Sequence, residues 1–172
     1  MINRSIEYKY TLNDKGIDYT KIQVMEKIKF KTTINATKEK VWDVLFGVES
    51  YPQWTAVFAE GSSVETDWKK GSKALFHDGK GDGMLALIEE NIPNQYLSIK
   101  HIGEIKDGKE IPHNWGESFE NYTLTEKDGK TELIIDMEII KEWLDYFEKT
   151  WPKALDKVKE MAEKRNEYHV ET

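Results

Sequence analysis

The sequence predicts an α+β fold in which a curved antiparallel sheet wraps around one long C-terminal helix. Residues 22–34 and several later segments alternate between apolar and polar side chains, as half-buried strands do. From Lys141 onward, apolar residues recur instead at the 3.6-residue spacing of a helix. One short helix and one ring-rich turn, between Ala36 and Trp54, separate the first strand from the others. This order of elements leaves a hollow between the sheet and the long helix.

The composition favours one acidic, folded domain. The chain has 172 residues, a net charge of −7, six Trp, eight Tyr and six Phe. This length suits one domain, and the rings argue against disorder. The negative charge disfavours binding to nucleic acid or to an anionic membrane. Lys27, Lys29 and Lys31 form a basic row, but they alternate with apolar residues, which is typical of the solvent face of a strand.

The absence of cysteine excludes disulfides, thiolate catalysis and cysteine-ligated metals. No stretch approaches the ~20 apolar residues of a membrane span, and no N-terminal run resembles a signal peptide. We therefore expect a cytoplasmic protein without membrane insertion, and we expect neither a metal nor a cofactor.

The N-terminal part predicts a hairpin followed by the first strand of the domain. Residues 6–12 alternate, and Asn13-Asp14-Lys15-Gly16 is a turn signal. We expect residues 1–21 to form an N-terminal extension or edge hairpin, residues 22–168 a single domain, and residues 169–172 a tail.

Cap residues predict the bounds of the short helices. Thr37 is a suitable N-cap, Gly47 ends the first helix, and residues 51–54 suit a single helical turn. The later strands are expected at residues 64–68, 73–77, 84–89, 96–105, 119–125 and 131–139. We expect residues 104–118 to form a long excursion, that is, a connection that leaves the predicted strands of the sheet. In the last helix, Pro152 removes one backbone donor and predicts a kink or a short break.

Several motifs occur in a recognisable order. They are Ile34-Asn35-Ala36-Thr37-Lys38-Glu39-Lys40-Val41-Trp42, Tyr51-Pro52-Gln53-Trp54, Lys70-Gly71, Glu89-Glu90-Asn91-Ile92-Pro93 with Tyr96-Leu97, and Trp151-Pro152-Lys153-Ala154-Leu155. In their order and spacing, residues 22–165 resemble the SRPBCC superfamily of START-like, helix-grip proteins. Within it, the chain is most similar to bacterial members with an AHSA1-like domain (activator of Hsp90 ATPase homologue 1-like).

The resemblance implies a helix-grip fold, with about seven antiparallel strands around the C-terminal helix and two short helices after the first strand. It also implies a cavity between sheet and helix, which the superfamily uses for apolar ligands. Its members include lipid carriers, hormone receptors and aromatase/cyclases, so the fold alone does not give the function.

Aromatic side chains are the candidates for lining this cavity. Each ring taken singly fits a packed core better, but together the rings favour a pocket, because a sheet curved around one helix cannot easily fill its interior. The predicted lining residues are Trp54, Phe58, Phe76, His101, Trp115, Phe119, Phe147 and Trp151.

The histidines offer weaker signals. His77, with Asp78 and Asp82, has metal-ligand chemistry, but a glycine-rich hairpin end in water explains these residues better. His101 is in phase with Leu97 and Ile99, so it faces the cavity, either as an acid or base or as a satisfied core histidine. His113 is a candidate for the cavity mouth.

The carboxylates give no constellation of a known catalytic type. Glu89 and Glu90 are adjacent on a strand and should point to opposite faces, so they should not form a pair. Glu117 and Glu120 flank Phe119, and either is a candidate for orienting a ligand. Surface charge explains all four equally well, and we assign no catalytic residue.

Three functions stay open at this point. The first is binding of a small hydrophobic or aromatic molecule, without catalysis, in a monomer or homodimer. The second is a cyclase, aromatase or hydrolase that uses a cavity His and Glu as acid and base. The third, which rests on the resemblance alone, is an Hsp90-cochaperone-like interaction module.

Overall fold

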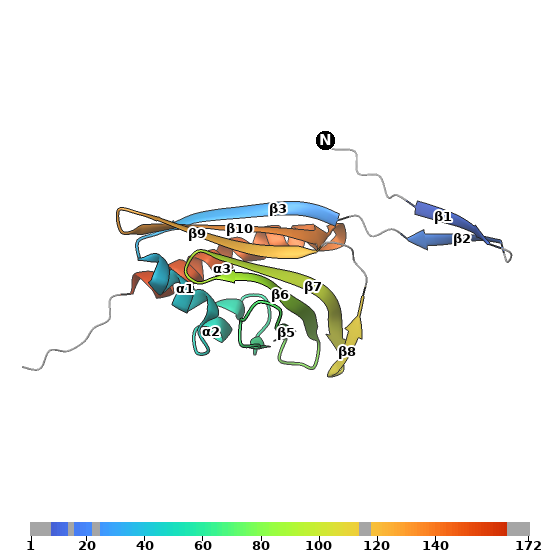
Figure 1. Cartoon of the computed structure of the whole chain (residues 1–172), viewed down its shortest axis with the longest axis horizontal. Coiled ribbons are helices and arrows are strands. Elements are labelled where there is room, and N and C mark those ends of the chain that lie inside the picture. Colours follow the sequence, from blue (N-terminus) through green and yellow to red (C-terminus); the bar gives the residue numbers. More distant parts are fainter. Residues whose placement is uncertain (1–7, 14–15, 22–24, 114–117, 165–172) are drawn as a thin grey trace, which may run out of the picture.

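The computed structural model describes residues 8–13, 16–21, 25–113 and 118–164. Its main sheet is antiparallel with strand order β3-β10-β9-β7-β6-β5-β4, and β8 pairs with β7. Figure 1 shows this curved sheet with helix α3 along its inner side and α1 and α2 at one end. The elements are β3 (Met25–Ile34), α1 (Lys38–Phe46), α2 (Tyr51–Thr55), β4 (Ser63–Glu65), β5 (Lys73–His77), β6 (Gly83–Ile92), β7 (Tyr96–Lys106), β8 (Lys109–Pro112), β9 (Phe119–Lys127), β10 (Lys130–Ile140) and α3 (Leu144–Glu163). The predicted helix-grip α+β fold is confirmed.

Two further strands precede the main sheet. β1 (Tyr8–Asn13) and β2 (Gly16–Lys21) pair antiparallel in a two-stranded sheet of their own, in which Asn13 lies opposite Gly16. A hairpin therefore forms where the turn signal predicts one. The division of the chain at residues 21 and 168 stays a prediction.

The basic row of β3 lies on the outer face of the sheet. Lys27, Lys29 and Lys31 are exposed, whereas the apolar residues between them are half-buried. The neighbouring strand β10 supplies partners for two of them. Lys27 Nζ lies 3.2 Å from Glu138 Oε1, and Lys31 Nζ lies 2.6 Å from Glu132 Oε2. Such pairs with exposed lysines are typical of a solvated sheet surface rather than of an anion-binding site.

Caps fix the short helices as predicted. The Thr37 hydroxyl accepts a hydrogen bond from the Lys40 amide at 3.4 Å, and the Gly47 amide donates to Asp43 O at 2.9 Å. A Cβ at Gly47 would lie 2.4 Å from that same carbonyl oxygen, so the chain can turn there only without a side chain. α2 then provides the expected single turn, with proline in its first turn.

Helix α3 differs from the prediction in one respect. It runs without a break through Pro152 and begins at Leu144, after a 3₁₀ turn at Lys141–Trp143. Pro152 is exposed, so the Glu148 carbonyl that loses its amide partner lies on the solvent side, where water can replace that partner. Of the two predicted alternatives, the short break is therefore wrong, whereas the kink stays a prediction. The buried residues of α3 include Trp151, Leu155 and Val158, which follow the apolar spacing that predicts this helix.

Part of the predicted excursion is a strand. β8 pairs with the end of β7, with Gly103 opposite Pro112. A Cβ at Gly103 would lie 2.4 Å from Ile111 O, so the close approach of β8 depends on this glycine. This strand is the addition to the predicted set of about seven.

A β-bulge corrects the expectation for Glu89 and Glu90. Ile88 pairs with Ile99, and Glu90 pairs with Ser98, so Glu89 is an extra residue between them. The bulge interrupts the alternation on which opposite faces were predicted. Both glutamates contribute to the wall of one hollow on the outer face of the sheet.

Candidate functional site

A polar pair lies on the inner face of the sheet. His101 of β7 is opposite Ala86, and Glu120 of β9 lies between Ile99 and Met137 on the neighbouring strands. All three of these neighbours belong to the buried core, so both polar side chains point inward. His101 Nε2 lies 3.1 Å from Glu120 Oε2, and the two side chains are 14% and 19% exposed. The inward direction of His101 agrees with its predicted phase.

Two buried tyrosines complete the polar cluster. The Tyr122 hydroxyl donates to Glu120 Oε1, so this carboxylate has a partner on each oxygen. Burial raises the pKa of Tyr122 well above its ordinary value, and the charge of Glu120 raises it further. Burial, followed by the charge of Glu120, also raises the pKa of Tyr51. Both phenols therefore stay neutral hydrogen-bond donors at physiological pH.

Aromatic rings surround this cluster. The Phe76 ring lies 6.3 Å from the His101 ring and 6.3 Å from that of Tyr51, as measured between centroids. On the helix side, the Trp151 ring lies 6.3 Å from that of Tyr122 and 5.0 Å from that of Phe58. The inner face therefore presents a His-Glu-Tyr cluster within an aromatic wall.

The predicted lining residues divide into three groups. Trp54 and Trp151 are buried, at 1% and 3% exposure, and their rings contact each other at 6.1 Å. Phe58, Phe76 and Phe147 are half-buried, as is His101. Side chains thus fill the deep part of the interior, while the half-buried rings lie nearer to solvent. Trp115 and Glu117 fall outside the described residues.

Phe119 corrects the predicted set. It lies opposite Lys100 and alternates with the inward-facing Glu120, so its ring is on the outer face of the sheet. Lys100 Nζ lies 5.6 Å from the centroid of this ring. Phe119 there borders a hollow of about 310 Å³, together with Glu89, Glu90, Tyr96, Ser98 and Asn121. Because adjacent residues of a strand point to opposite faces, Phe119 and Glu120 cannot both line the inner face.

Two buried ring nitrogens near the cluster lack a hydrogen-bond partner. They are His101 Nδ1 and Trp151 Nε1, and the statement covers the part of the chain that the structure describes. A buried polar atom without a partner destabilises the protein by about 1–3 kcal/mol. Such atoms are therefore candidates for contact with a bound molecule.

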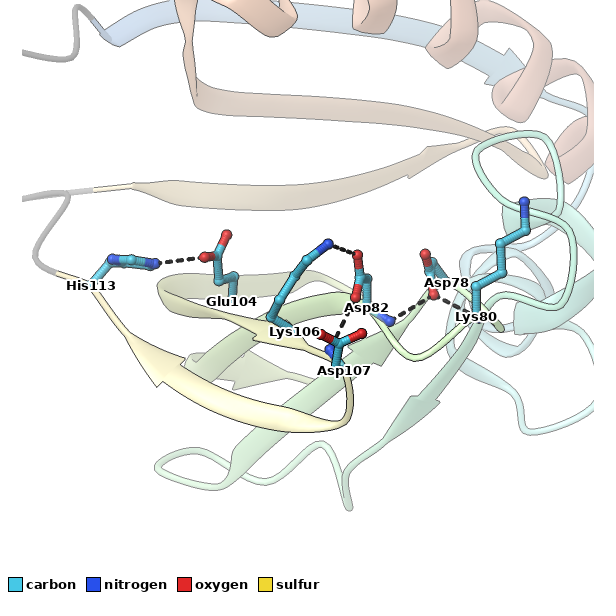
Figure 2. A network of polar contacts seen from close by, with 7 residues as sticks. All are labelled: Asp78, Lys80, Asp82, Glu104, Lys106, Asp107 and His113. Atoms are coloured by element: carbon cyan, nitrogen blue, oxygen red, sulfur yellow. Dashed lines mark hydrogen bonds and ion pairs between the residues drawn. The ribbon is translucent and has the colours of Figure 1, made fainter.

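The acidic hairpin end contains a network of hydrogen bonds and one ion pair. Figure 2 shows the Asp78 carboxylate directed at the backbone of Lys80 and Asp82, and the Lys106 side chain directed at the Asp82 carboxylate. Asp78 Oδ1 accepts from the amides of Lys80 and Asp82 at 2.7 and 3.0 Å. Asp82 pairs with Lys106, and the hydrogen bond between them lowers the pKa of Asp82 and raises that of Lys106. Among the described residues, no group of His, Asp and Glu side chains is arranged to hold a metal.

The other two described histidines have acidic neighbours at the surface. His77 Nε2 lies 3.0 Å from Glu65 Oε1, and His113 Nε2 lies 3.1 Å from Glu104 Oε1, the latter pair being visible in Figure 2. Neither histidine approaches the inner cluster in these contacts.

Sequence reasoning missed the most informative partner of His101. It weighed Glu120 without connecting it to the histidine, and it did not select Tyr122 or Tyr51. The missing information is the pairing of β7 with β9, which joins residues 19 positions apart. The alternation Glu120, Tyr122, Leu124 was available as a signal that Glu120 shares a face with buried residues.

A curved antiparallel sheet that grips one long C-terminal helix is the arrangement of START-like helix-grip proteins. Residues 35–163 match the family described as Activator of Hsp90 ATPase homolog 1-like protein, and the chain belongs to this family. No match to the sequence is found among curated proteins.

Solved structures with this fold are distant in sequence. Protein MLL2253 from Mesorhizobium loti is 15% identical with a TM-score of 0.62, over 79% of this chain and 96% of that one. The Aha1 dimer from Colwellia psychrerythraea is 17% identical with a TM-score of 0.61, over 80% and 96%. DynU16, from the dynemicin biosynthetic locus, is 14% identical with a TM-score of 0.60, over 78% of this chain and 46% of that one. These similarities support the fold alone. In the described part of the chain, no helix is long and apolar enough to cross a membrane.

Proposed function

We propose that this protein binds a small hydrophobic or aromatic molecule between the sheet and α3, with the His101–Glu120 pair as its polar contact. The observation that carries the proposal is the buried His101 Nδ1, which lacks a partner among the described residues and lies within an aromatic wall.

The half-buried rings are the apolar part of the proposed site. Phe58, Phe76 and Phe147 retain solvent-exposed surface, and a ligand that covers it gains about 25 cal/mol for each Å² buried. The contacts among Phe58, Trp151 and Phe147 have centroid distances of 5.0 and 6.2 Å. A ligand that enters more deeply has to separate these rings, so binding should rearrange them.

His101 determines a second property that the ligand needs, a hydrogen-bond donor. When His101 carries a single ring proton, the Glu120 carboxylate, which can only accept, places that proton on Nε2. Nδ1 then keeps a lone pair and acts as an acceptor. The preferred ligand is therefore an apolar ring system that carries a hydroxyl or N–H donor.

Native mass spectrometry of the purified protein, followed by thermal-shift screening of apolar aromatics and lipids, tests this function. A ligand that binds only the folded state must raise the melting temperature. Phe58→Ala should weaken the shift, whereas Val57→Ala, at a neighbouring residue that is 38% exposed, should leave it unchanged. Absence of a co-purifying molecule and of any shift across the panel would contradict ligand binding.

An acid–base enzyme is the second candidate, and the same pair favours it. A histidine hydrogen-bonded to a carboxylate, with its second nitrogen free, resembles a general base with its orienting group. Once a converted substrate is known, Glu120→Gln and His101→Gln should each reduce turnover with the fold preserved. Unchanged turnover in both variants would eliminate this mechanism.

A further inference from the structure

A second hollow lies between helix α1, the segment around Trp68 and strand β6. It has a volume of about 170 Å³ and is lined by Trp42, Asp43, Phe46, Gly47, Trp68 and Asn91. We call it the Trp42–Trp68 hollow. Its lining residues differ from those of the proposed ligand site, although Phe46 packs on Tyr122, and Trp68 packs on Tyr51 and Phe76.

Aromatic rings form one part of its wall. The Phe46 ring lies 4.7 Å from the Trp42 ring and 5.0 Å from the Trp68 ring, as measured between centroids. Phe46 is buried, whereas both indoles are half-buried. The hollow is therefore bordered by two partly exposed indole rings, the side chains with the strongest attraction for cations at their faces.

The backbone at Trp68 is held in an uncommon conformation. Its φ is +59°, a region that disfavours bulky residues. Two hydrogen bonds hold it there: Asn91 Nδ2 donates to Trp68 O at 2.7 Å, and the Trp68 amide donates to Thr66 Oγ1 at 3.2 Å. Strain of this kind, maintained by neighbouring groups, is found preferentially at ligand sites.

The polar groups of the hollow are acceptors. Because Asn91 Nδ2 donates to a carbonyl, the orientation of this amide is fixed, and Oδ1 is the remaining atom. That oxygen is buried and has no partner in the described part of the chain. The lining also includes Asp43, which is exposed and carries the only charge among the six lining residues. A cation in the hollow would therefore lie near the Asp43 carboxylate, the unpartnered Asn91 Oδ1 and two indole rings.

We propose that the Trp42–Trp68 hollow binds a small organic cation, an ammonium or guanidinium head group. The small volume of the hollow, about 170 Å³, suits a ligand of this size. The net charge of −7 adds a favourable long-range field for such a ligand.

The full-length protein is titrated at low ionic strength with N-methylguanidinium and with tetramethylammonium. Two neutral molecules of similar shape, N-methylurea and tert-butanol, serve as matched ligands without charge. The readout is the indole N–H resonances of Trp42 and Trp68 in ¹H–¹⁵N spectra. At least one cation should bind more tightly than its neutral counterpart, and added salt should weaken this binding because salt screens exposed charges.

Variants then test the assigned residues. Asp43→Asn should weaken cation binding roughly threefold, as expected for an exposed charge pair, and Trp42→Ala should weaken it roughly fivefold or more through the lost cation–π contact. Asp156→Asn removes the same charge from an exposed position on α3, and Trp143→Ala removes an indole that is 54% exposed elsewhere; both should bind like the parent protein. If Trp42→Ala does not fold, Asp43→Asn decides the question.

The source of the cation is distinguished by a further titration. The capped peptide Ac-Ala-Arg-Ala-NH₂ is compared with N-methylguanidinium. Tighter binding of the peptide supports recognition of an arginine side chain, and tighter binding of the free cation supports a small-molecule ligand. Equal binding of neutral and cationic probes, or unperturbed indole resonances at millimolar cation, overturns the proposal, and neither result bears on binding between the sheet and α3.

Discussion

His101 Nε2 and Glu120 Oε2 lie 3.1 Å apart across the β7–β9 pairing, on the face of the sheet that packs against α3. Both side chains are mostly buried, yet each keeps some contact with solvent. The pair therefore combines two properties that a binding site needs: an orientation set by rigid strands, and access from outside.

The first prediction concerns ligand selectivity. His101→Leu removes the Nδ1 acceptor and keeps an apolar side chain of comparable size. For a pair of aromatic ligands that differ only in one hydroxyl group, we expect this variant to lose roughly tenfold in affinity for the hydroxylated member, the value of one neutral hydrogen bond. Affinity for the member without the hydroxyl should change little. Isothermal titration calorimetry of both ligands against both proteins measures the difference.

Equal losses for the two ligands would show that the histidine supports the shape of the site rather than the hydrogen bond. His101→Gln is a useful companion variant, because its amide oxygen can accept from the same hydroxyl. Partial recovery of selectivity in that variant would support the assigned acceptor role.

The second prediction is a loss of stability in alkali. Burial raises the pKa of Tyr122 and of Tyr51 above the value in the unfolded chain. In the window above pH 10, the unfolded state has released these protons and the folded state retains them, so the free energy of unfolding falls as pH rises. Below that window, the contribution is fully present. Urea denaturation at a series of pH values between 8 and 11 measures the slope.

Tyr122→Phe is the matched variant for this measurement. It removes one titrating group, so the decline with pH should become shallower. It also removes the hydrogen bond to Glu120, which should lower the free energy of unfolding at pH 7 by about 1–2 kcal/mol. An alkaline decline as steep as in the parent protein would exclude Tyr122 as its source.

Most of the fold could be predicted because its signals are local. Thr37 and Gly47 set the two ends of α1, and each does so by a hydrogen bond to a residue at most four positions away. The alternation along β3 likewise shows directly which residues are half-buried. β8 and the bulge at Glu89 were missed because each depends on how two strands meet. Exposed residues such as those of β8 show no alternation in hydropathy.

The candidate site was predictable only in part. The phase of β7 gave the direction of His101, but its partner Glu120 depends on the register between strands. The aromatic composition predicted a wall of rings without indicating how completely those rings fill the space among themselves. The Trp42–Trp68 hollow had no signal at all, since Trp42, Trp68 and Asn91 come from three separate segments.

A third prediction separates core tryptophan from surface tryptophan. Trp151 is 3% exposed, and its ring contacts those of Phe30, Trp54, Phe58 and Tyr122. Trp151→Ala should therefore lower the free energy of unfolding by about 3–5 kcal/mol through lost contacts and the cavity that remains. Trp143 is 54% exposed, and Trp143→Ala should change the free energy of unfolding by less than about 0.5 kcal/mol. Urea denaturation of both variants gives the comparison, and similar losses would contradict the packing described for α3.

The last prediction concerns the contact between β7 and β8. A Cβ at Gly103 would lie 2.4 Å from Ile111 O and 2.9 Å from Pro112 Cα, both of them backbone atoms. β8 is short and exposed, so it should yield before β7, which is buried at several positions. Gly103→Ala should therefore release β8 locally and leave the main sheet folded. The His113 amide is the reporter, since it donates to Ile102 O at 2.9 Å beyond the end of β8.

Amide hydrogen exchange measures this release. In Gly103→Ala, the His113 amide should exchange roughly tenfold faster or more, corresponding to about 1.4 kcal/mol of lost local stability, while amides at the centre of β7 keep their protection. Gly129→Ala is the control: it introduces a methyl group at a φ of +71° with nothing within 4 Å, so it strains a distant turn without touching β8. Unchanged exchange at His113 in Gly103→Ala would mean that β8 tolerates the methyl group, and that the glycine does not set the approach of the two strands.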